Sequence, residues 1–411
     1  MARGIVYLSN GRLFAKGDGD ASACAPIESP FAQSIRQRAS ELQRRHAWKS
    51  QGRGAAFISG AALWGGDQND PAQMRIDITG VCRGTDDGDL FYALQSQDIS
   101  GVLRRREGSS AELRILHTSD YRVGPLAAQP GTGRLALTIR HRGGSTIAVM
   151  GADGSEFSEI TQGESMDESP CWVPNAPNRL VFQSAGLATN ERGQTVGLGP
   201  YAIQMLDLET GRMTSIVEDA KTEFLAPKIA TDGVLHYIRR PYGLAKRKFH
   251  LFRFIEDLLL LPFRLIYAIF QFLNFFTMRY TGKPLAKGGP SNERASDMPA
   301  DMMLWGNLIQ ARKSMNNDKE GTVSLVPASW ELCRHAKDGQ PEALAKGVLS
   351  YDLENDGGIV YSNGNAIFRR SPEGKISRLH RDAMIQQVIA ASYQPEAVAT
   401  EVSGIAALDA R

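Results

Sequence analysis

A repeat of about 45 residues constrains this chain more than any other feature of its sequence. Leu90, Leu135 and Leu180 recur at that interval, and each begins a short apolar stretch of strand length. Two further strand-like stretches, separated by tight turns, follow in every unit. Short strands at this period are typical of a four-stranded antiparallel propeller blade. Ten residues before the three leucines stand Gly80, Pro125 and Pro170.

Weaker copies of the unit extend in both directions. Strand-like stretches occur at 56–59, 234–238 and 323–326, and the stretch 358–364 nearly repeats 4–11. We therefore predict an all-β protein, a β-propeller of about seven four-stranded blades with a range of six to eight.

The repeat is expected to fill residues 1–411 as a single domain. A ring removes its free strand edges only if it closes. The apolar segment 402–408 is predicted to pair with the N-terminal unit and so close the ring.

One repeat carries a family resemblance. The stretches 167–174, 179–182 and 201–207, followed by the Thr210-Gly211 turn, resemble the TolB-type (PD40, WD40-like) propeller repeat. In that family a Ser-Pro-x-Trp core precedes a Ser-Pro-Asp-Gly turn, which 173–176 replaces here by Val-Pro-Asn-Ala. The resemblance implies the propeller fold over most of the chain. It does not imply the role of TolB itself, because no export signal is recognisable before the first strand.

The composition excludes several classes of protein. Hydrophobic residues make up 42% and charged residues 22%, which excludes wholesale disorder, a collagen-like chain and a polytopic membrane protein. A net charge of +2 provides no global field for nucleic acid. The four cysteines are far apart and form no C-x-x-C pair, so we expect free thiols rather than a zinc site.

A first insertion into the ring spans 18–53. Ser29 and Pro30 are a favourable N-cap and first helical residue, and they predict a helix over 31–49. This helix either is solvated on the propeller or contacts an acidic partner such as anionic lipid. Nucleic acid is unlikely as the partner, since Trp48 is the only aromatic residue among the basic ones. The basic surface consists of Arg36, Arg38, Arg44, Arg45 and Lys49.

A second insertion spans 244–300, and its centre, 249–276, is strongly apolar. Placed on a helix, this centre has one narrow polar stripe and a wide apolar face, with a kink expected at Pro262. The polar stripe contains Arg253, Glu256, Asp257, Arg264, Tyr267, Gln271 and Asn274. The candidate membrane- or partner-binding residues are Phe252, Ile255, Leu258, Leu259, Phe263, Ile266, Phe270, Leu273 and Phe276.

Three interpretations of this helix compete. A membrane crossing would separate the two parts of one ring, so an interfacial helix or packing against protein is favoured. Basic flanks favour the interfacial position, because each cation near an anionic leaflet contributes about 1 kcal/mol. The flanking cations are Lys246, Arg247, Lys248, Arg279 and Lys283.

No catalytic, phosphate-binding or metal-binding motif is present, so we predict no catalytic residue, no cofactor and no metal. The leading hypothesis is a non-enzymatic propeller scaffold that binds other proteins, which are themselves membrane-associated. It would be cytoplasmic and peripherally attached to the inner, anionic face of the cell membrane. Two alternatives remain: a subunit of a membrane complex whose helix docks on a partner, and a hydrolase or lyase with its active site in the propeller channel.

Overall fold

The computed structural model shows a chain that is almost entirely β-structure. It describes residues 4–17, 24–50, 76–84, 88–96, 99–109, 111–141, 143–189, 195–242, 301–304, 307–310, 316–317, 323–335 and 340–391. The chain separates into two compact units, 243–302 and the remainder. The blades described below belong to the larger unit.

Three antiparallel sheets come from the N-terminal half, together with one C-terminal strand. The first contains β29 (Ile385–Ala390), β1 (Ile5–Ser9), β2 (Arg12–Lys16) and β3 (Cys24–Ile27). The second contains β4 (Asp77–Arg83), β5 (Asp89–Gln95), β6 (Ser100–Arg106) and β7 (Glu112–Thr118). The third contains β8 (Arg122–Gln129), β9 (Arg134–Arg140), β10 (Ser145–Gly151) and β11 (Ser158–Glu159).

Three more sheets follow. The fourth contains β12 (Ser165–Trp172), β13 (Arg179–Thr189), β15 (Ala202–Asp207) and β16 (Met213–Val217), with β14 (Thr195–Leu198) on the end of β13. The fifth contains β17 (Thr222–Ile229), β18 (Leu235–Pro241), β23 (Glu331–His335) and β24 (Pro341–Lys346). The sixth contains β25 (Ser350–Leu353), β26 (Ile359–Ser362), β27 (Ala366–Arg370) and β28 (Ile376–Arg381). Two short pairs lie outside the blades: β19 (Asp301–Leu304) with β20 (Asn307–Gln310), and β21 (Asn316–Asn317) with β22 (Val323–Ser324).

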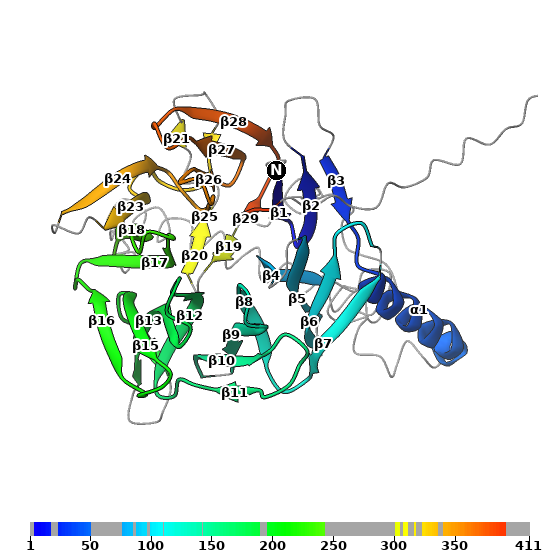
Figure 1. Cartoon of the computed structure of the whole chain (residues 1–411). Coiled ribbons are helices and arrows are strands. Elements are labelled where there is room, and N and C mark those ends of the chain that lie inside the picture. The colour runs from blue at the N-terminus through cyan, green and yellow to red at the C-terminus, as the bar shows by residue number, and fades with distance from the viewer. Residues whose placement is uncertain are drawn as a thin grey trace, which may run out of the picture. The chain divides into compact units, whose positions relative to one another are not determined.

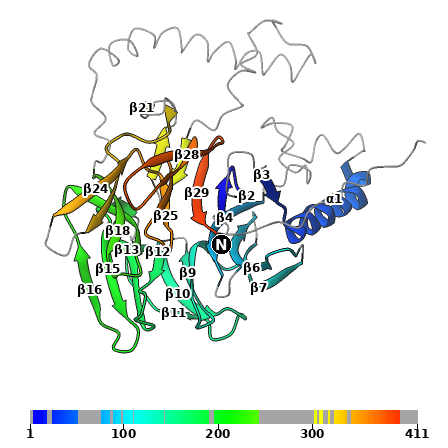
Figure 2. The same cartoon turned by 45° about the horizontal axis from the view of Figure 1, so that its top comes forward.

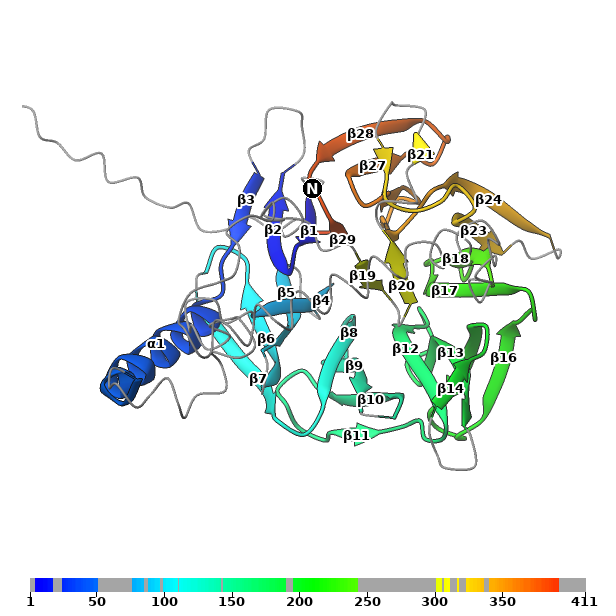
Figure 3. The same cartoon turned by 180° about the vertical axis from the view of Figure 1, so that it is seen from behind.

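These six groups of strands are the blades of one propeller, and a single parallel pairing of Ser145 with Met166 joins the third and fourth blades into one nine-stranded sheet. The innermost strand of each blade contacts that of the next, in the order β29, β4, β8, β12, β17, β25 and back to β29. Figures 1 and 3 show the blades arranged in this order around a common axis. The predicted all-β propeller is therefore confirmed, and the described strands form six blades, the lower end of the expected range.

The difference from about seven blades has a clear origin in the fifth blade. Its strands β18 and β23 are hydrogen-bonded neighbours, with Tyr237 opposite Cys333, although the second insertion separates them in the chain. The sequence pattern counted 234–238 and 323–326, on either side of that insertion, as separate copies of the unit; another weak copy, 56–59, lies outside the described residues. Strand pairing across the insertion makes the two half-blades into one.

The ring closes through the pairing of β29 with β1. Ile5 lies opposite Ala390 and Tyr7 opposite Val388, so the C-terminal strand becomes the innermost strand of the first blade. The amide of Ala391 adds a hydrogen bond of 3.2 Å to the carbonyl of Gly4. The segment 402–408, which the sequence pattern proposed for this closure, lies outside the described residues.

The repeat leucines occupy equivalent positions. Leu90, Leu135 and Leu180 lie in β5, β9 and β13, the second strands of three consecutive blades, and all three are buried. The repetition extends to the preceding inner strands, because β4, β8, β12 and β17 each contain a β-bulge. These bulges include Gly80, Pro125, Pro170 and Pro227.

Two of the bulges are tied to the preceding blade by a side chain. Ser169 and Ala226 adopt φ values of 55° and 50°, a left-handed conformation that non-glycine residues rarely adopt. The amide of Ser169 donates to Thr138 Oγ1 at 3.1 Å, and that of Ala226 donates to Gln183 Oε1 at 2.7 Å. Thr138 and Gln183 are themselves one repeat apart, so the same connection between blades occurs twice.

Helix α1 (Pro30–Ser50) begins where the Ser-Pro dipeptide predicts. Ser29 Oγ accepts the amide hydrogen of Ala32 at 3.2 Å and donates to Glu112 Oε2 at 3.0 Å. The same carboxylate oxygen accepts from the Phe31 amide at 3.0 Å, which fixes the first turn on β7. Figure 2 shows α1 on the outer side of this blade. Within the described part of the chain, no helix has the length and hydropathy needed to span a membrane.

Ring closure through β29 makes a prediction about stability. Ile385 on β29 is fully buried, so Ile385→Ala should lower the free energy of unfolding by about 2–5 kcal/mol, measured by urea unfolding. The matched control is Ile376→Ala on the outer strand β28, where the side chain is 40% exposed. That variant should change stability by less than about 0.5 kcal/mol. Equal effects at both positions would contradict a ring that depends on β29.

Candidate functional site

A large cavity lies at the centre of the ring. Its volume is about 1960 Å³, and its walls are the inner strands together with the turns 173–177, 230–232 and 353–357. Because all six inner strands contribute, residues far apart in the sequence face one space. The charged side chains among its lining are Asp77, Arg83, Asp89, Glu107, Arg140, Lys228, Asp232, Asp352, Glu354 and Asp356.

Asp352, on the sixth blade, is the centre of an ion-pair network. Its carboxylate accepts from Lys228 Nζ at 2.6 Å and from the Ala390 amide at 2.8 Å, and Arg83 approaches to 3.7 Å. Lys228 belongs to the fifth blade, Ala390 to the first and Arg83 to the second. One buried carboxylate therefore connects four of the six blades.

The electrostatics of this network stabilise the ionised form. Burial of Asp352 acts to raise its pKa, but Lys228 and Arg83 outweigh burial, and the pKa lies below its ordinary value of 3.8. The carboxylate is therefore charged at neutral pH. A buried charge is tolerated when it is paired and hydrogen-bonded, which is the arrangement here.

A second buried ion pair stands between the third and fourth blades. Arg140 Nε donates to Glu168 Oε1 at 2.9 Å, and Glu168 is completely buried. The hydroxyl of Tyr201 lies 3.4 Å from the other carboxylate oxygen. Burial raises the pKa of Tyr201, with a further contribution from the charge of Glu168, so the phenol stays neutral. Arg140 thus faces the cavity with its charge already compensated.

Two cysteines also line the cavity, Cys82 and Cys171, and all four cysteines of the chain are free. Burial raises the pKa of Cys82 to about 12 and also raises that of Cys171. Lys228 opposes this shift at both thiols without reversing it. The thiolate is the nucleophilic form, so these side chains are unreactive at neutral pH.

The chemistry available in the cavity is that of paired charges. Among the described lining residues there are seven carboxylates, three cations and no histidine. In the described part of the chain, no three His, Cys, Asp or Glu side chains gather as a metal site. The alternative of a channel-based active site requires a channel not filled by apolar side chains, and this cavity is open with a mixed polar and apolar lining.

The positions predicted from sequence divide into two groups. The membrane- or partner-binding residues of 249–276 and their basic flanks lie outside the described residues. On α1, Arg36 and Arg38 are exposed, whereas the side chains of Arg44, Arg45 and Lys49 are not described. The sequence reasoning missed Asp352 and its partners, because they are distant in the chain and share no motif.

Comparisons with known proteins agree with the fold. No family model and no curated protein matches the chain. The solved structure of TolB from Acinetobacter baumannii superposes with a TM-score of 0.50 at 10% identity, covering 96% of this chain and 67% of that one. A nidogen/laminin complex gives a TM-score of 0.49 at 6% identity, covering 95% and 100%. Together with the ring of six blades, the superposition on TolB shows a β-propeller of TolB-like fold, as the repeat resemblance predicts.

The Asp352 network makes a prediction about pH. Asp352→Asn should lower the free energy of unfolding at pH 7 by about 1.5–3 kcal/mol, because Lys228 loses its charged partner. The folded pKa lies below the unfolded one, so the stabilisation is present above pH 3.8 and is lost as pH falls through the folded pKa.

The variant should accordingly show a flatter pH dependence of unfolding in acid than the wild type. Unfolding of Lys228→Met and of the double variant provides the control. The double variant should lose less than the sum of the two single effects. Strict additivity would mean that the pair does not interact.

Proposed function

We propose that this propeller is a scaffold that binds a basic segment of a partner protein in its central cavity. The observation that carries this proposal is the cavity itself, which is open, carries charged side chains in a mixed lining and is surrounded by all six blades. Small-molecule pockets measure about 300–1,000 Å³. A space of about 1960 Å³ is larger than such ligands need and accommodates a stretch of polypeptide.

The charged side chains of the cavity indicate which kind of partner segment would bind there. Seven carboxylates and three cations of the described residues line the cavity; Asp89 and Glu354 are paired with Arg104 and Arg369, while Asp232 and Asp356 stand exposed on the turns that follow β17 and β25. The cations Arg83 and Lys228 already approach Asp352. Complementary charge steers association and selects the partner. A segment rich in Lys or Arg is therefore the favoured occupant.

Removing the two exposed carboxylates tests this binding mode. Each accepts a backbone hydrogen bond through Oδ1, from Val234 to Asp232 at 2.9 Å and from Gly358 to Asp356 at 3.0 Å. Asparagine keeps that acceptor and removes only the charge. Asp232→Asn with Asp356→Asn should therefore leave the fold intact and weaken partner capture, with a reduced salt dependence.

The measurement is affinity purification in mild detergent at two salt concentrations, with quantification of the co-purified protein. Asp153→Asn is the matched control, because Asp153 accepts a turn bond from Ser155 in the same way but does not line the cavity. Partner capture that is unaffected by the cavity variant, or lost equally in the control, would contradict the proposal.

We further propose that the scaffold is held on the cytoplasmic face of the membrane by the segment 249–276. This segment lies outside the described residues, so the support comes from sequence alone. An apolar face with one polar stripe and cations at both ends is typical of an interfacial helix. Docking of the same face on a membrane-associated partner is the competing arrangement.

Charges placed on the apolar face should release the protein from the membrane. Leu259→Asp, Phe263→Asp and Ile266→Asp together are expected to move the chain into the soluble fraction and to abolish co-sedimentation with anionic vesicles. Deletion of 244–300 should have the same effect.

The control carries the same added charge on the polar stripe, with Tyr267→Asp, Gln271→Asp and Asn274→Asp. It should retain most of the membrane binding. If the deletion variant stays attached to the membrane, this anchor is excluded. If the variants are released from cell membranes but the wild-type protein does not bind vesicles, docking on a partner is favoured.

A further inference from the structure

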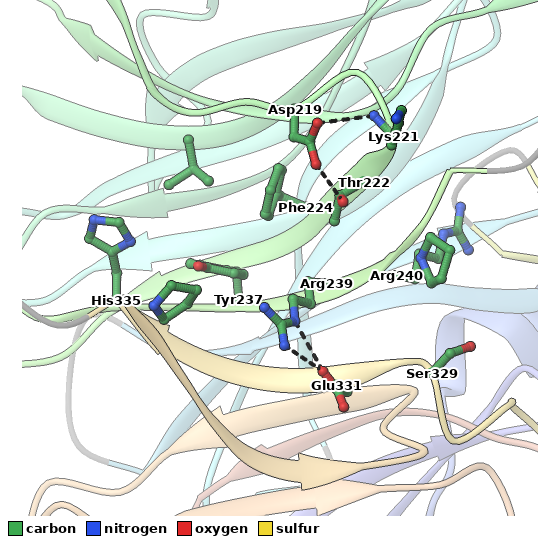
Figure 4. Close-up of a pocket in the computed structure, with 13 residues that line it drawn as sticks. Asp219, Lys221, Thr222, Phe224, Tyr237, Arg239, Arg240, Ser329, Glu331 and His335 are labelled. Atoms are coloured by element: carbon green, nitrogen blue, oxygen red, sulfur yellow. Dashed lines mark hydrogen bonds and ion pairs between the residues drawn. The ribbon is translucent and has the colours of Figure 1, made fainter. Parts of the chain in front are cut away.

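A second cavity, of about 480 Å³, lies on the fifth blade beside the outer strand of the fourth. Its wall contains residues of β17, β18 and β23 that share one face, since Tyr237 pairs with Cys333 and Arg239 pairs with Glu331. Val217, at the end of β16, contributes from the fourth blade, and Pro341 from the start of β24. Figure 4 shows Tyr237, Arg239 and Glu331 among the side chains around the cavity.

Two hydrogen-bonding groups in this cavity have no partner among the described residues. Tyr237 lines the cavity with 1% of the residue exposed, and its hydroxyl, which is not among the fully buried polar atoms, makes no hydrogen bond to the described residues. His335 Nδ1 is buried and equally unpartnered. The two rings lie with centroids 6.5 Å apart, and the hydroxyl end of Tyr237 is turned toward His335 (Figure 4). A buried polar group without a partner is destabilising, so its presence requires an explanation.

The arginines of the cavity and Glu331, by contrast, are compensated, and the other two charged lining residues, Asp219 and Lys221, are exposed. Arg239 donates from two nitrogens to Glu331 Oε2, at 3.0 and 2.8 Å. Arg240 pairs with the buried Glu223 and lies 4.5 Å from the ring centroid of Trp330. These pairs leave no buried charge that requires a counter-ion from a ligand. The groups without a partner, the Tyr237 hydroxyl and His335 Nδ1, are neutral hydrogen-bonding groups, so they favour an uncharged ligand.

The remaining wall is apolar. Phe224 meets Tyr237 edge to face, with centroids 5.4 Å apart, and Val217, Pro241 and Pro341 complete the surface. An aromatic ring of a ligand packs well against an aromatic edge and proline rings. The volume lies in the usual range for small-ligand sites.

We propose that this cavity binds an uncharged molecule that joins an aromatic ring to a carboxamide. The ring lies against Phe224 and Val217, and the amide meets the Tyr237 hydroxyl and His335 Nδ1. An amide offers both a donor and an acceptor, which is what a hydroxyl and an imidazole nitrogen together require. This site is separate from the central cavity and does not depend on the partner proposed for it.

Titration of the full-length protein with benzamide, followed by NMR or calorimetry, tests the site. Benzamide should bind, and Tyr237→Phe should weaken its binding by about tenfold, the effect of one buried hydrogen bond. Benzoate has the same shape with a charge and should bind far more weakly. N-acetyl-phenylalanine amide distinguishes the source of the ligand, because tighter binding than benzamide indicates a peptide. Equal binding of benzoate, no binding of benzamide, or unchanged binding by the variant would each overturn the proposal.

Thermal unfolding of the same variant supplies an independent readout. Because its hydroxyl is unpartnered, Tyr237→Phe should leave the melting temperature unchanged or raise it. The matched control is Tyr351→Phe, which removes a hydroxyl that donates to the Ala226 carbonyl at 2.7 Å and should lower the melting temperature. If both variants lose stability equally, the Tyr237 hydroxyl has a structural partner and the proposed site is wrong. His335→Leu should weaken benzamide binding as Tyr237→Phe does, and unchanged binding would also overturn the proposal.

Discussion

Pairing of the first and last described strands is the constraint on which the rest of this structure depends. A propeller blade is a small sheet with two edges, and its inner edge is protected only when the ring is complete. Here closure is non-covalent, through the ladder of β1 with β29. That ladder places Ala390 where its amide reaches the Asp352 carboxylate, at 2.8 Å. The contacts of Asp352 with Ala390 and with Arg83 therefore depend on ring closure, whereas its pair with Lys228 joins adjacent blades.

Polar contacts, as well as apolar packing, connect the blades. Asp352 joins four of them, the Arg140–Glu168 pair joins two, and the bulges at Ser169 and Ala226 are each bonded to the preceding blade. Apolar contacts between sheets are tolerant of small displacements, whereas a buried hydrogen bond requires a defined geometry. These bonds consequently fix the angular position of each blade and give the central cavity rigid, charged walls.

The local features of the fold follow from the sequence because they depend on neighbours in the chain. The second strands of three blades were located by Leu90, Leu135 and Leu180, the Asn10-Gly11 turn joins β1 to β2, and Ser29 caps α1. The number of blades could not be predicted from the sequence in the same way. β18 and β23 form one sheet although the insertion stands between them, and no local pattern reveals a pairing of that range.

The sequence by itself determined the class of fold, since short strand-like stretches and tight turns at a period of about 45 residues are typical of propeller blades. It also located the amphipathic segment 249–276, whose pattern is readable without coordinates. Only the tertiary structure brought Arg83, Lys228 and Asp352 together, and only it placed Tyr237 beside His335, whose Nδ1 has no hydrogen-bond partner among the described residues, in the wall of one cavity. The physical reason is that periodicity records the burial of each unit, whereas a site is formed by single residues from different units, which the closed ring alone places together.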